Sequence, residues 1–241
     1  MPPATFQNIP TGCAKLDEIL GGGFSPGELS LIYGEAETAK TTLAMQCAVN
    51  CAAMGFKTLF VDSDGTFSAR RLSQIAMYHD FDKIAERIIL AKPKDFREQA
   101  MVINRLADYL TKDFRLVVVD TLTSLYRAEL AENPERTFEI NRELNRQMAW
   151  LAQTARAGKL AVIVVSQVRS VLDEAIVSVE PVATRVLKFW ADAILAMKPT
   201  ENEEVIKVSI EKKGRATGFV SCYLRIEERG LVDYYPQKIE G

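Results

Sequence analysis

The sequence predicts an α/β fold in which a mostly parallel, doubly wound sheet carries an antiparallel C-terminal extension. Short apolar runs alternate with amphipathic stretches through residues 9–165, which is typical of parallel strands joined by helices. The runs at 116–119 and 160–165 are apolar throughout, as expected for strands buried on both faces of a sheet. After residue 190, strand-like runs separated by turn residues indicate a meander on the sheet edge.

The composition is that of an ordinary globular protein, with 241 residues, 48% of them hydrophobic and 26% charged. This length favours a single domain over residues 1–241, with a flexible tail over residues 1–8. The net charge of −2 predicts no general affinity for nucleic acid, so any DNA contact must come from local basic loops. We find no apolar run of about 20 residues that would span a membrane and no secretory signal. The four cysteines form no CxxC pair, which fits a reducing, cytoplasmic location.

Helices are expected where apolar residues recur every three or four positions and where glycine or a capping side chain marks an end. Three glycines end the first helix, Gly55 ends the second, Ser68 caps the third and Gly158 ends the last. The expected helices cover residues 13–20, 41–54, 68–78, 94–110 and 138–157.

Strands are expected at the apolar runs between these helices and in the C-terminal meander. Residues 127–137 are polar and contain Pro134, so we expect a mobile loop there. Residues 168–186 show no clear period and are expected to be irregular. The expected strands cover residues 29–33, 57–61, 88–91, 116–119, 160–165, 191–197, 205–211 and 219–226.

The chain is organised around ELSLIYGEAETAKTTL, residues 28–43. An apolar strand, a turn and a helix follow one another with the spacing of a phosphate-binding loop, G-x-x-x-x-G-K-[ST]. Backbone amides of such a loop and the N-terminus of its helix favour an anion. The alternative is an ordinary surface Lys-Thr-Thr at the start of a helix. The residues expected to surround the nucleotide are Gly34, Glu35, Ala36, Glu37, Thr38, Ala39, Lys40, Thr41 and Thr42.

The pattern predicts a role for two positions of this loop and raises a question about the conformation of a third. Lys40 would reach the β- and γ-phosphates as a compact cation, and the Thr41 hydroxyl would bind Mg²⁺. Ala39 stands where the pattern has its second glycine. A helical φ at Ala39 costs nothing, whereas a positive φ costs about 1–2 kcal/mol relative to glycine. The sequence leaves both open.

Polar side chains follow three of the expected strands. Asp120 ends a buried strand, where a carboxylate would hold Mg²⁺ through its water shell; the alternative is an N-cap of the next turn. Asp64 follows the second strand and would polarise the attacking water, unless it is a turn residue before Gly65. Gln167 would sense the γ-phosphate, and the alternative is a strand-end amide that caps a loop.

Four segments in this order resemble the core of the RecA/RadA recombinase superfamily, and most closely the short archaeal RadB family. The resemblance covers residues 9–233. The segments are IPTGCAKLDEILGGGFSPGELSLIYGEAETAKTTLAMQ, VDSDGTFSARRL, LVVVDTLTSLYR and VIVVSQV.

The resemblance implies a RecA-like P-loop ATPase core that binds ATP and Mg²⁺. It implies that Lys40, Asp64 and Gln167 take part in hydrolysis, that Thr41 and Asp120 hold the metal, and that Arg71 stacks on adenine. Residues 127–137 and 169–184 correspond to the two loops that face DNA in this family. The arginines expected at or next to those loops are Arg127, Arg136, Arg169 and Arg185.

Lys213 and Arg215 form a K-x-R pair whose spacing puts both side chains on one face of a strand. Related KaiC-like ATPases use a similar pair to reach the γ-phosphate of a neighbouring subunit, which implies a homo-oligomer. The alternative is an exposed cationic turn.

The sequence also departs from the recombinase pattern. No helical DNA-binding domain precedes the core in this sequence, and Asp64 is one methylene shorter than the glutamate of the recombinases. The second loop carries acidic residues and no aromatic residue, which disfavours base stacking and phosphate attraction. We therefore expect nucleotide binding with weak, DNA-dependent ATPase activity and weak DNA binding that prefers single strands.

These features favour an accessory factor for DNA repair and homologous recombination that assists the main RadA recombinase and associates with the nucleoid. Two alternatives stay open. One is an autonomous DNA-dependent ATPase that performs strand exchange, and the other is a KaiC-like signalling ATPase that does not bind DNA.

Overall fold

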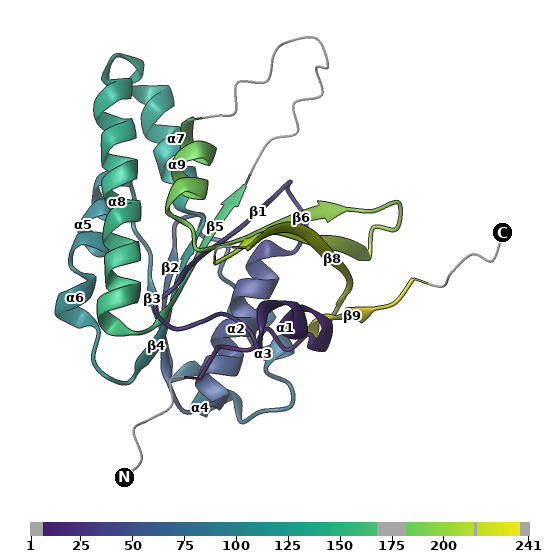
Figure 1. The fold of residues 1–241 in the computed structure, drawn as a ribbon. Helices are drawn as coiled ribbons and strands as arrows, with labels where there is room; N and C mark the ends of the chain where they lie inside the picture. The colour runs from purple at the N-terminus through teal and green to yellow at the C-terminus, as the bar shows by residue number, and fades with distance from the viewer. Residues whose placement is uncertain (1–6, 168–181, 215, 237–241) are drawn as a thin grey trace.

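The structure, a computed structural model, describes residues 7–167, 182–214 and 216–236. Within these residues nine strands form one sheet in the order β3-β2-β4-β5-β1-β6-β7-β8-β9 (Figure 1). Strands β1 to β6 pair in parallel, and β6 to β9 pair antiparallel. The expected parallel sheet with an antiparallel extension is thereby confirmed. The strands are β1 Leu29–Gly34, β2 Lys57–Asp62, β3 Ile88–Ala91, β4 Phe114–Asp120, β5 Ala161–Gln167, β6 Ala193–Pro199, β7 Val205–Lys213, β8 Ala216–Glu227 and β9 Gly230–Tyr234.

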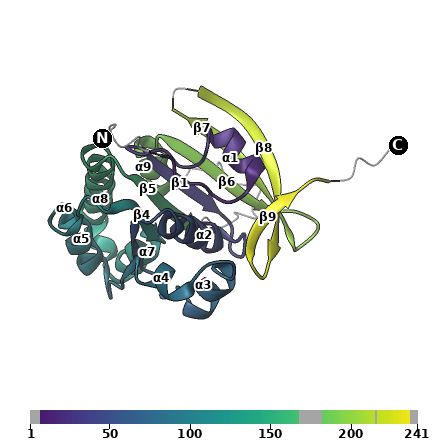
Figure 2. The same cartoon turned by 90° about the horizontal axis from the view of Figure 1, so that it is seen from below.

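Helices cover both faces of this sheet (Figures 1 and 2). Helices α1 to α4 pack on one apolar cluster, and α5 to α9 pack on the other. Alternate residues of the central strands enter opposite clusters, as in Val117 and Val118 of β4, because strand side chains alternate between faces. The helices are α1 Ala14–Leu20, α2 Lys40–Ala53, α3 Ala69–Ile75, α4 Phe81–Ala85, α5 Phe96–Asn104, α6 Leu106–Tyr109, α7 Leu122–Glu132, the short 3₁₀ helix η1 Pro134–Arg136, α8 Thr137–Gly158 and α9 Val182–Trp190.

The prediction of a mobile loop over residues 127–137 is wrong. Helix α7 continues to Glu132, and η1 leads directly into α8. Tyr126 is buried, and its hydroxyl donates to Asn141 Oδ1 of α8 at 2.6 Å. Leu130 packs against the second apolar cluster. These contacts with α8 and the cluster anchor a polar stretch whose Arg, Ala, Glu and Leu residues are themselves strong helix formers.

The expected irregular segment over residues 168–186 is also wrong at its end. Residues 168–181 lie outside the described residues, but α9 begins at Val182. Leu187 is fully buried, and Ala183 and Val186 pack against the same cluster. One apolar face of this helix therefore supplies the packing energy that favours it.

Three further boundaries differ from the expectation. The helix from Ser68 ends at Ile75, and α4 follows it. The helix over 94–110 is interrupted at Arg105, where φ is −101° and ψ is 9°. Because Ile103 and Leu106 are both buried on either side, the apolar pattern continues across the break. The sequence did not predict strand β9, which has five residues and follows β8 after a two-residue turn.

At the N-terminus, residues 1–6 of the expected flexible tail lie outside the described residues. Gln7 is exposed, whereas the Asn8 amide donates to Gly21 O at 2.9 Å. In the part of the chain that the structure describes, no helix has both the length and the apolar character that a membrane crossing requires.

Candidate nucleotide-binding site

The phosphate-loop sequence lies at the centre of the sheet, at the carboxyl end of β1. Gly34 ends this strand between Gln167 of β5 and Met197 of β6, and α2 begins at Lys40. A Cβ on Gly34 would lie 2.0 Å from Met197 O, so only glycine allows this close approach of strands. The strand, turn and helix therefore have the arrangement that the loop pattern predicted.

Ala39 adopts the left-handed conformation, with φ of 58° and ψ of 26°. The open question about this residue is thereby answered, since a non-glycine residue in this region costs about 1–2 kcal/mol. Glu37, also in the loop, has a φ of 61°. The loop keeps the backbone shape of a glycine-containing sequence although alanine occupies the position.

Lys40 is buried within the loop, with 7% of its surface exposed. Its Nζ donates to Glu35 O and, at 3.1 Å, to Thr38 Oγ1. Burial lowers the pKa of Lys40 to about 8, against the opposing effect of the charges on Asp120, Asp64 and Glu35. The ammonium thus points into the loop rather than to solvent, which argues against an ordinary surface lysine.

Asp120 ends β4 beside this loop and is fully buried. Burial, together with the charges of Asp64 and Asp62, raises the pKa of its carboxyl to about 6 against the lowering effects of Thr41 and Lys40. The Thr41 hydroxyl lies near enough to lower this pKa, but neither carboxylate oxygen accepts a hydrogen bond of regular geometry.

A buried carboxylate without partners is costly, and a divalent cation would satisfy it. The chemistry of the donors fits Mg²⁺, which binds one or two carboxylate or hydroxyl oxygens and keeps several waters. Among the described residues, no group of three or more His, Cys, Asp or Glu side chains could hold a metal ion. A cation at Asp120 would therefore keep water ligands. The alternative of an N-cap fails, because Thr121 is the N-cap of α7 and the Asp120 oxygens accept no hydrogen bond.

Asp64 lies on the exposed turn after β2, and its Oδ2 accepts a hydrogen bond from Thr121 Oγ1 at 3.1 Å. The turn itself is held by Asp62, whose carboxylate accepts from the amides of Thr66 at 3.0 Å and Phe67 at 3.2 Å. The sequence left open that Asp64 is only a turn residue. In the structure it is Asp62 that stabilises this turn. The Asp64 carboxylate is directed toward the strand that carries Asp120.

Gln167 ends β5 directly beside Gly34. Arg127 of α7 donates from Nη1 to Gln167 O at 3.2 Å, and one helical turn earlier the hydroxyls of Thr123 and Ser166 lie 3.1 Å apart. Helix α7 is therefore fastened to the end of β5. The expected DNA-facing Arg127 is half-buried and contacts the backbone of the expected γ-phosphate sensor.

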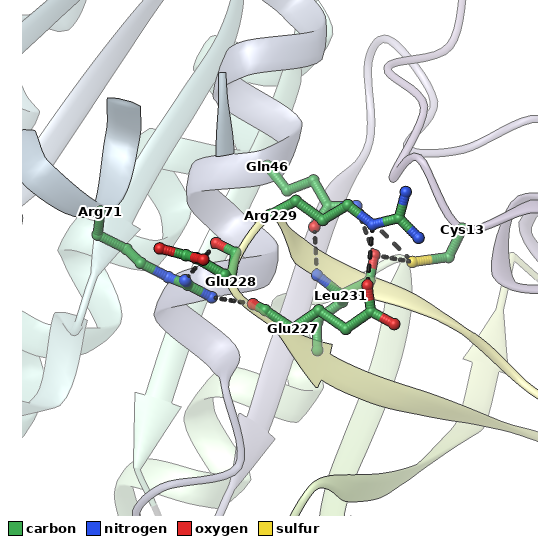
Figure 3. Close-up of polar contacts among 7 residues, drawn as sticks. All are labelled: Cys13, Gln46, Arg71, Glu227, Glu228, Arg229 and Leu231. Carbon is green, nitrogen blue, oxygen red and sulfur yellow. Dashed lines mark hydrogen bonds and ion pairs between the residues drawn. The ribbon is translucent and has the colours of Figure 1, made fainter. Parts of the chain in front are cut away.

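The β8–β9 turn is bound to the first turns of α3 and to the middle of α2, as Figure 3 shows. Arg71 donates to Glu228 O at 2.7 Å and to Glu227 O at 3.0 Å. Gln46 of α2 donates to Leu231 O at 3.0 Å and accepts from Leu231 N at 2.8 Å. The guanidinium of Arg71, the residue expected at the adenine, is thus held in one place by backbone carbonyls.

Three of the remaining expected cations lie in the part of the chain that the structure describes. Arg136 is exposed and pairs with Glu139 at 3.0 Å and Glu129 at 3.7 Å, and Arg185 is exposed on α9. Lys213 Nζ contacts Glu28 Oε2 at 3.1 Å and Ser25 Oγ at 3.0 Å. Arg169 and Arg215 lie outside the described residues.

Sequence reasoning did not identify Thr121, the partner of Asp64, or Gln46, the partner of β9. The Thr that follows Asp120 in the sequence is a signal that a search for strand-end hydroxyls would have found. Gln46 and Leu231 are 185 positions apart, and no local pattern connects them.

The sheet order, the loop after β1 and the strand-end carboxylate of β4 define a protein with the RecA-like fold of P-loop NTPases. A family model described as Rad51 matches residues 4–234. The chain therefore belongs to the Rad51 family and, within it, to the RadB proteins.

The relatives that support this assignment cover nearly the whole chain. The "DNA repair and recombination protein RadB" of Thermococcus gammatolerans is 37% identical over 229 residues, which are 93% of this chain and 98% of that protein. The protein of the same name from Thermococcus kodakarensis is 36% identical over 227 residues, 93% of this chain and 99% of that one. A solved structure described as the crystal structure of the RadB recombinase matches with a TM-score of 0.80 and 36% identity, over 94% of this chain and 100% of that chain. The resemblance found in the sequence is thereby confirmed.

Proposed function

We propose that this chain is an accessory factor in DNA repair and homologous recombination that binds ATP with Mg²⁺ and assists the main RadA recombinase. The observation that carries the proposal is Asp120, a buried carboxylate whose two oxygens have no partner, next to Thr41 and the buried Lys40. A RecA-like protein without a nucleotide site would have no reason to keep this costly group. The name of its relatives supports the role in repair and recombination.

The residues of the site have separate roles in this proposal. The loop amides over residues 34–42 and the Lys40 ammonium bind the phosphates. Thr41 and Asp120 hold Mg²⁺, which when bound would neutralise charge on the phosphates. Asp64 accepts a proton from the attacking water, and Gln167 lies at the γ-phosphate end of the site. Arg71 supports the base.

Hydrolysis is proposed to be weak and stimulated by DNA. Asp64 has a shorter side chain than glutamate, and misplacement of a reacting group by about 1 Å costs roughly 10²-fold in rate. DNA binding is proposed to be weak and to prefer single strands, with Arg127, Arg136, Arg169 and Arg185 as contacts. Such a role also implies a cytoplasmic protein associated with the nucleoid.

Titration with ATP in the presence and absence of Mg²⁺ tests the central claim. We expect binding that needs Mg²⁺, and we expect Lys40→Ala to reduce ATP affinity by at least tenfold. The control is Lys57→Ala, at the amino end of β2 and therefore at the opposite edge of the parallel sheet from the loop, which should leave the affinity unchanged. Equal ATP affinity in the parent and in Lys40→Ala would end the proposal.

ATPase assays with single-stranded DNA and with the cognate RadA test the accessory role. We expect slow turnover that rises with single-stranded DNA, and a stable complex with RadA in sedimentation. Filaments and strand exchange by this chain alone would favour an autonomous recombinase instead. Rings that do not bind DNA at any salt concentration would favour a signalling ATPase.

A further inference from the structure

Thr121 occupies a helix N-cap but does not act as a cap. It directly follows Asp120 and precedes α7, yet its side chain makes no capping hydrogen bond with the helix. A threonine at this position usually accepts from an amide of the first turn, which is worth about 1 kcal/mol. Thr121 is 4% exposed and donates instead to Asp64 Oδ2 at 3.1 Å. A local preference given up in this way is typical of a functional position.

The hydrogen bonds around Thr121 have a fixed direction. Its Oγ1 lies 2.6 Å from Ser124 Oγ and 3.1 Å from Asp64 Oδ2. A hydroxyl has one proton to donate, and the exposed carboxylate is an acceptor when it is ionised. Thr121 therefore donates to Asp64, and Ser124 must donate to Thr121. The result is a chain of two hydroxyls that ends on one oxygen of Asp64.

These two hydrogen-bonded hydroxyls compensate for the short side chain of Asp64. The carboxylate lies on an exposed turn next to Gly65, whose φ is 69°, and among the described residues it has no other hydrogen bond to hold it. Occupying Oδ2 from the buried side restricts the rotation of the carboxylate and leaves Oδ1 for a water molecule. This hydroxyl belongs to the residue next to Asp120. The carboxyl end of β4 therefore positions the carboxylates of both Asp120 and Asp64.

We propose that Thr121, supported by Ser124, is a positioning residue that fixes the Asp64 carboxylate for water activation in ATP hydrolysis. This inference rests on the proposed ATPase activity. Thr121 itself touches neither the nucleotide nor the metal in this account.

The orientation of Asp64 is tested without nucleotide. Three-bond Hα–Hβ couplings of Asp64, measured by NMR, should report one rotamer in the parent and averaged rotamers in Thr121→Val. Thr121→Ser, which keeps the hydroxyl, should restore the single rotamer, and Ser124→Ala should give an intermediate result. A single rotamer in Thr121→Val would overturn the proposal whether or not the protein hydrolyses ATP.

The contribution to hydrolysis is tested by steady-state kinetics. We expect Thr121→Val to lower kcat about tenfold with KM for ATP within twofold, because only the reacting geometry changes. In an Asp64→Asn background the same change should have no further effect. An equal loss in both backgrounds would overturn the proposal. A parent without ATPase activity would contradict the proposed hydrolysis, and the rotamer measurement would still decide the position of Asp64.

Thr123→Val is the matched control. Thr123 lies two residues later, in the first turn of α7, is buried to a similar extent and pairs its hydroxyl with Ser166 instead of Asp64. Thr121→Val loses two hydrogen bonds, with Asp64 and with Ser124, and Thr123→Val loses one, with Ser166. At about 1 kcal/mol for each bond, both variants should lower the free energy of unfolding, by about 2 and about 1 kcal/mol. Only Thr121→Val should release Asp64. Release of Asp64 in both variants would show a general loosening of α7 and would contradict a specific role for Thr121.

Discussion

At the scale of single residues, the loop after β1 and the adjacent end of β4 each contain a feature that destabilises the free protein. Ala39 has a positive φ of 58°, and Asp120 is a buried carboxylate without partners. Each is a local cost of a kind that natural proteins commonly tolerate at functional sites. Each also makes a prediction that can be measured in the absence of nucleotide.

We expect Ala39→Gly to raise the free energy of unfolding by about 0.5–1 kcal/mol. The relief of left-handed strain exceeds the extra chain entropy that glycine loses on folding. Urea denaturation measures the difference. The control is Ala128→Gly in the exposed middle of α7, which should cost about 1 kcal/mol. Similar losses in both variants would show that Ala39 is not strained.

We expect Asp120→Asn to stabilise the Mg²⁺-free protein by about 2–3 kcal/mol at pH 7.5. The folded-state pKa of Asp120 is about 6, above its ordinary value of 3.8. The folded state therefore binds the proton more tightly, and the cost of the ionised group is fully present above pH 6 and absent below the ordinary pKa. The gain should disappear as the pH falls toward 4.

Denaturation of both proteins at the two pH values provides the measurement. A gain of the same size at pH 7.5 and pH 4 would contradict the assignment to ionisation of Asp120. The same variant should also lose the dependence of ATP binding on Mg²⁺, which a purely structural carboxylate would not affect.

At the scale of elements, two segments fix the site from outside the loop. Helix α7 is fastened to the ends of β2 and β5 through Thr121, Thr123 and Arg127. The β8–β9 turn is bound to α2 through Gln46 and to α3 through Arg71 (Figure 3). The helix that begins at Lys40 is thus held at its middle by a C-terminal hairpin, and changes in that hairpin should reach the loop.

We expect Gly230→Ala to lower the free energy of unfolding by about 2–4 kcal/mol. Gly230 has a φ of +117°, and a Cβ there would lie 2.5 Å from Gln46 Oε1. The variant combines left-handed strain with disruption of a buried amide pair. The control is Gly55→Ala, where φ is also positive but nothing lies within 4 Å of the new Cβ. Equal losses in the two variants, measured by chemical denaturation, would show that the Gln46 contact is unimportant.

At the scale of the whole molecule, Lys213 and the loop lie at opposite ends of the central strands. Ala193 pairs with Ser30 and Lys213, whereas Met197 pairs with Gly34. Four residues of strand correspond to about 13 Å, so Lys213 does not reach the loop of its own chain. If it meets a phosphate, that phosphate belongs to a neighbouring protomer.

We expect Lys40→Ala and Lys213→Ala each to lower ATP hydrolysis, and a mixture of the two proteins to recover part of it. Mixed interfaces would join an intact loop to an intact Lys213. The control is Glu28→Ala, which removes the partner of Lys213 within the chain and should leave hydrolysis unchanged. Full activity of Lys213→Ala, or no recovery on mixing, would leave Lys213 with only its contacts to Ser25 and Glu28. The partly exposed ion pair with Glu28 is worth at most about 1 kcal/mol.

Features of the site that depend on residues close together in the sequence could be predicted, and those that depend on distant residues could not. The roles proposed for Gly34, Lys40 and Thr41 came from a local spacing, and the structure puts these residues in a strand–turn–helix as expected. Asp120 came from its place at the end of an apolar run. The partner of Asp64 lies 57 positions away, and no period or motif joins the two.

The error over residues 127–137 has a different cause. The polarity of this stretch and Pro134 suggested a loop, but Arg, Ala, Glu and Leu at positions 127–132 are all strong helix formers. Contacts of Tyr126 with α8 and of Leu130 with the second apolar cluster add to this local preference.

By itself the sequence determined the alternation of strands and helices, the antiparallel tail and the phosphate-loop spacing, because each depends on neighbouring residues and on the period of apolar side chains. Only the tertiary structure decided the positive φ at Ala39, the isolation of the Asp120 carboxylate, the direction of the Thr121 hydroxyl and the attachment of Gln46 to β9. These depend on atoms that approach one another from distant parts of the chain, and their energies arise from burial and geometry that no local pattern contains.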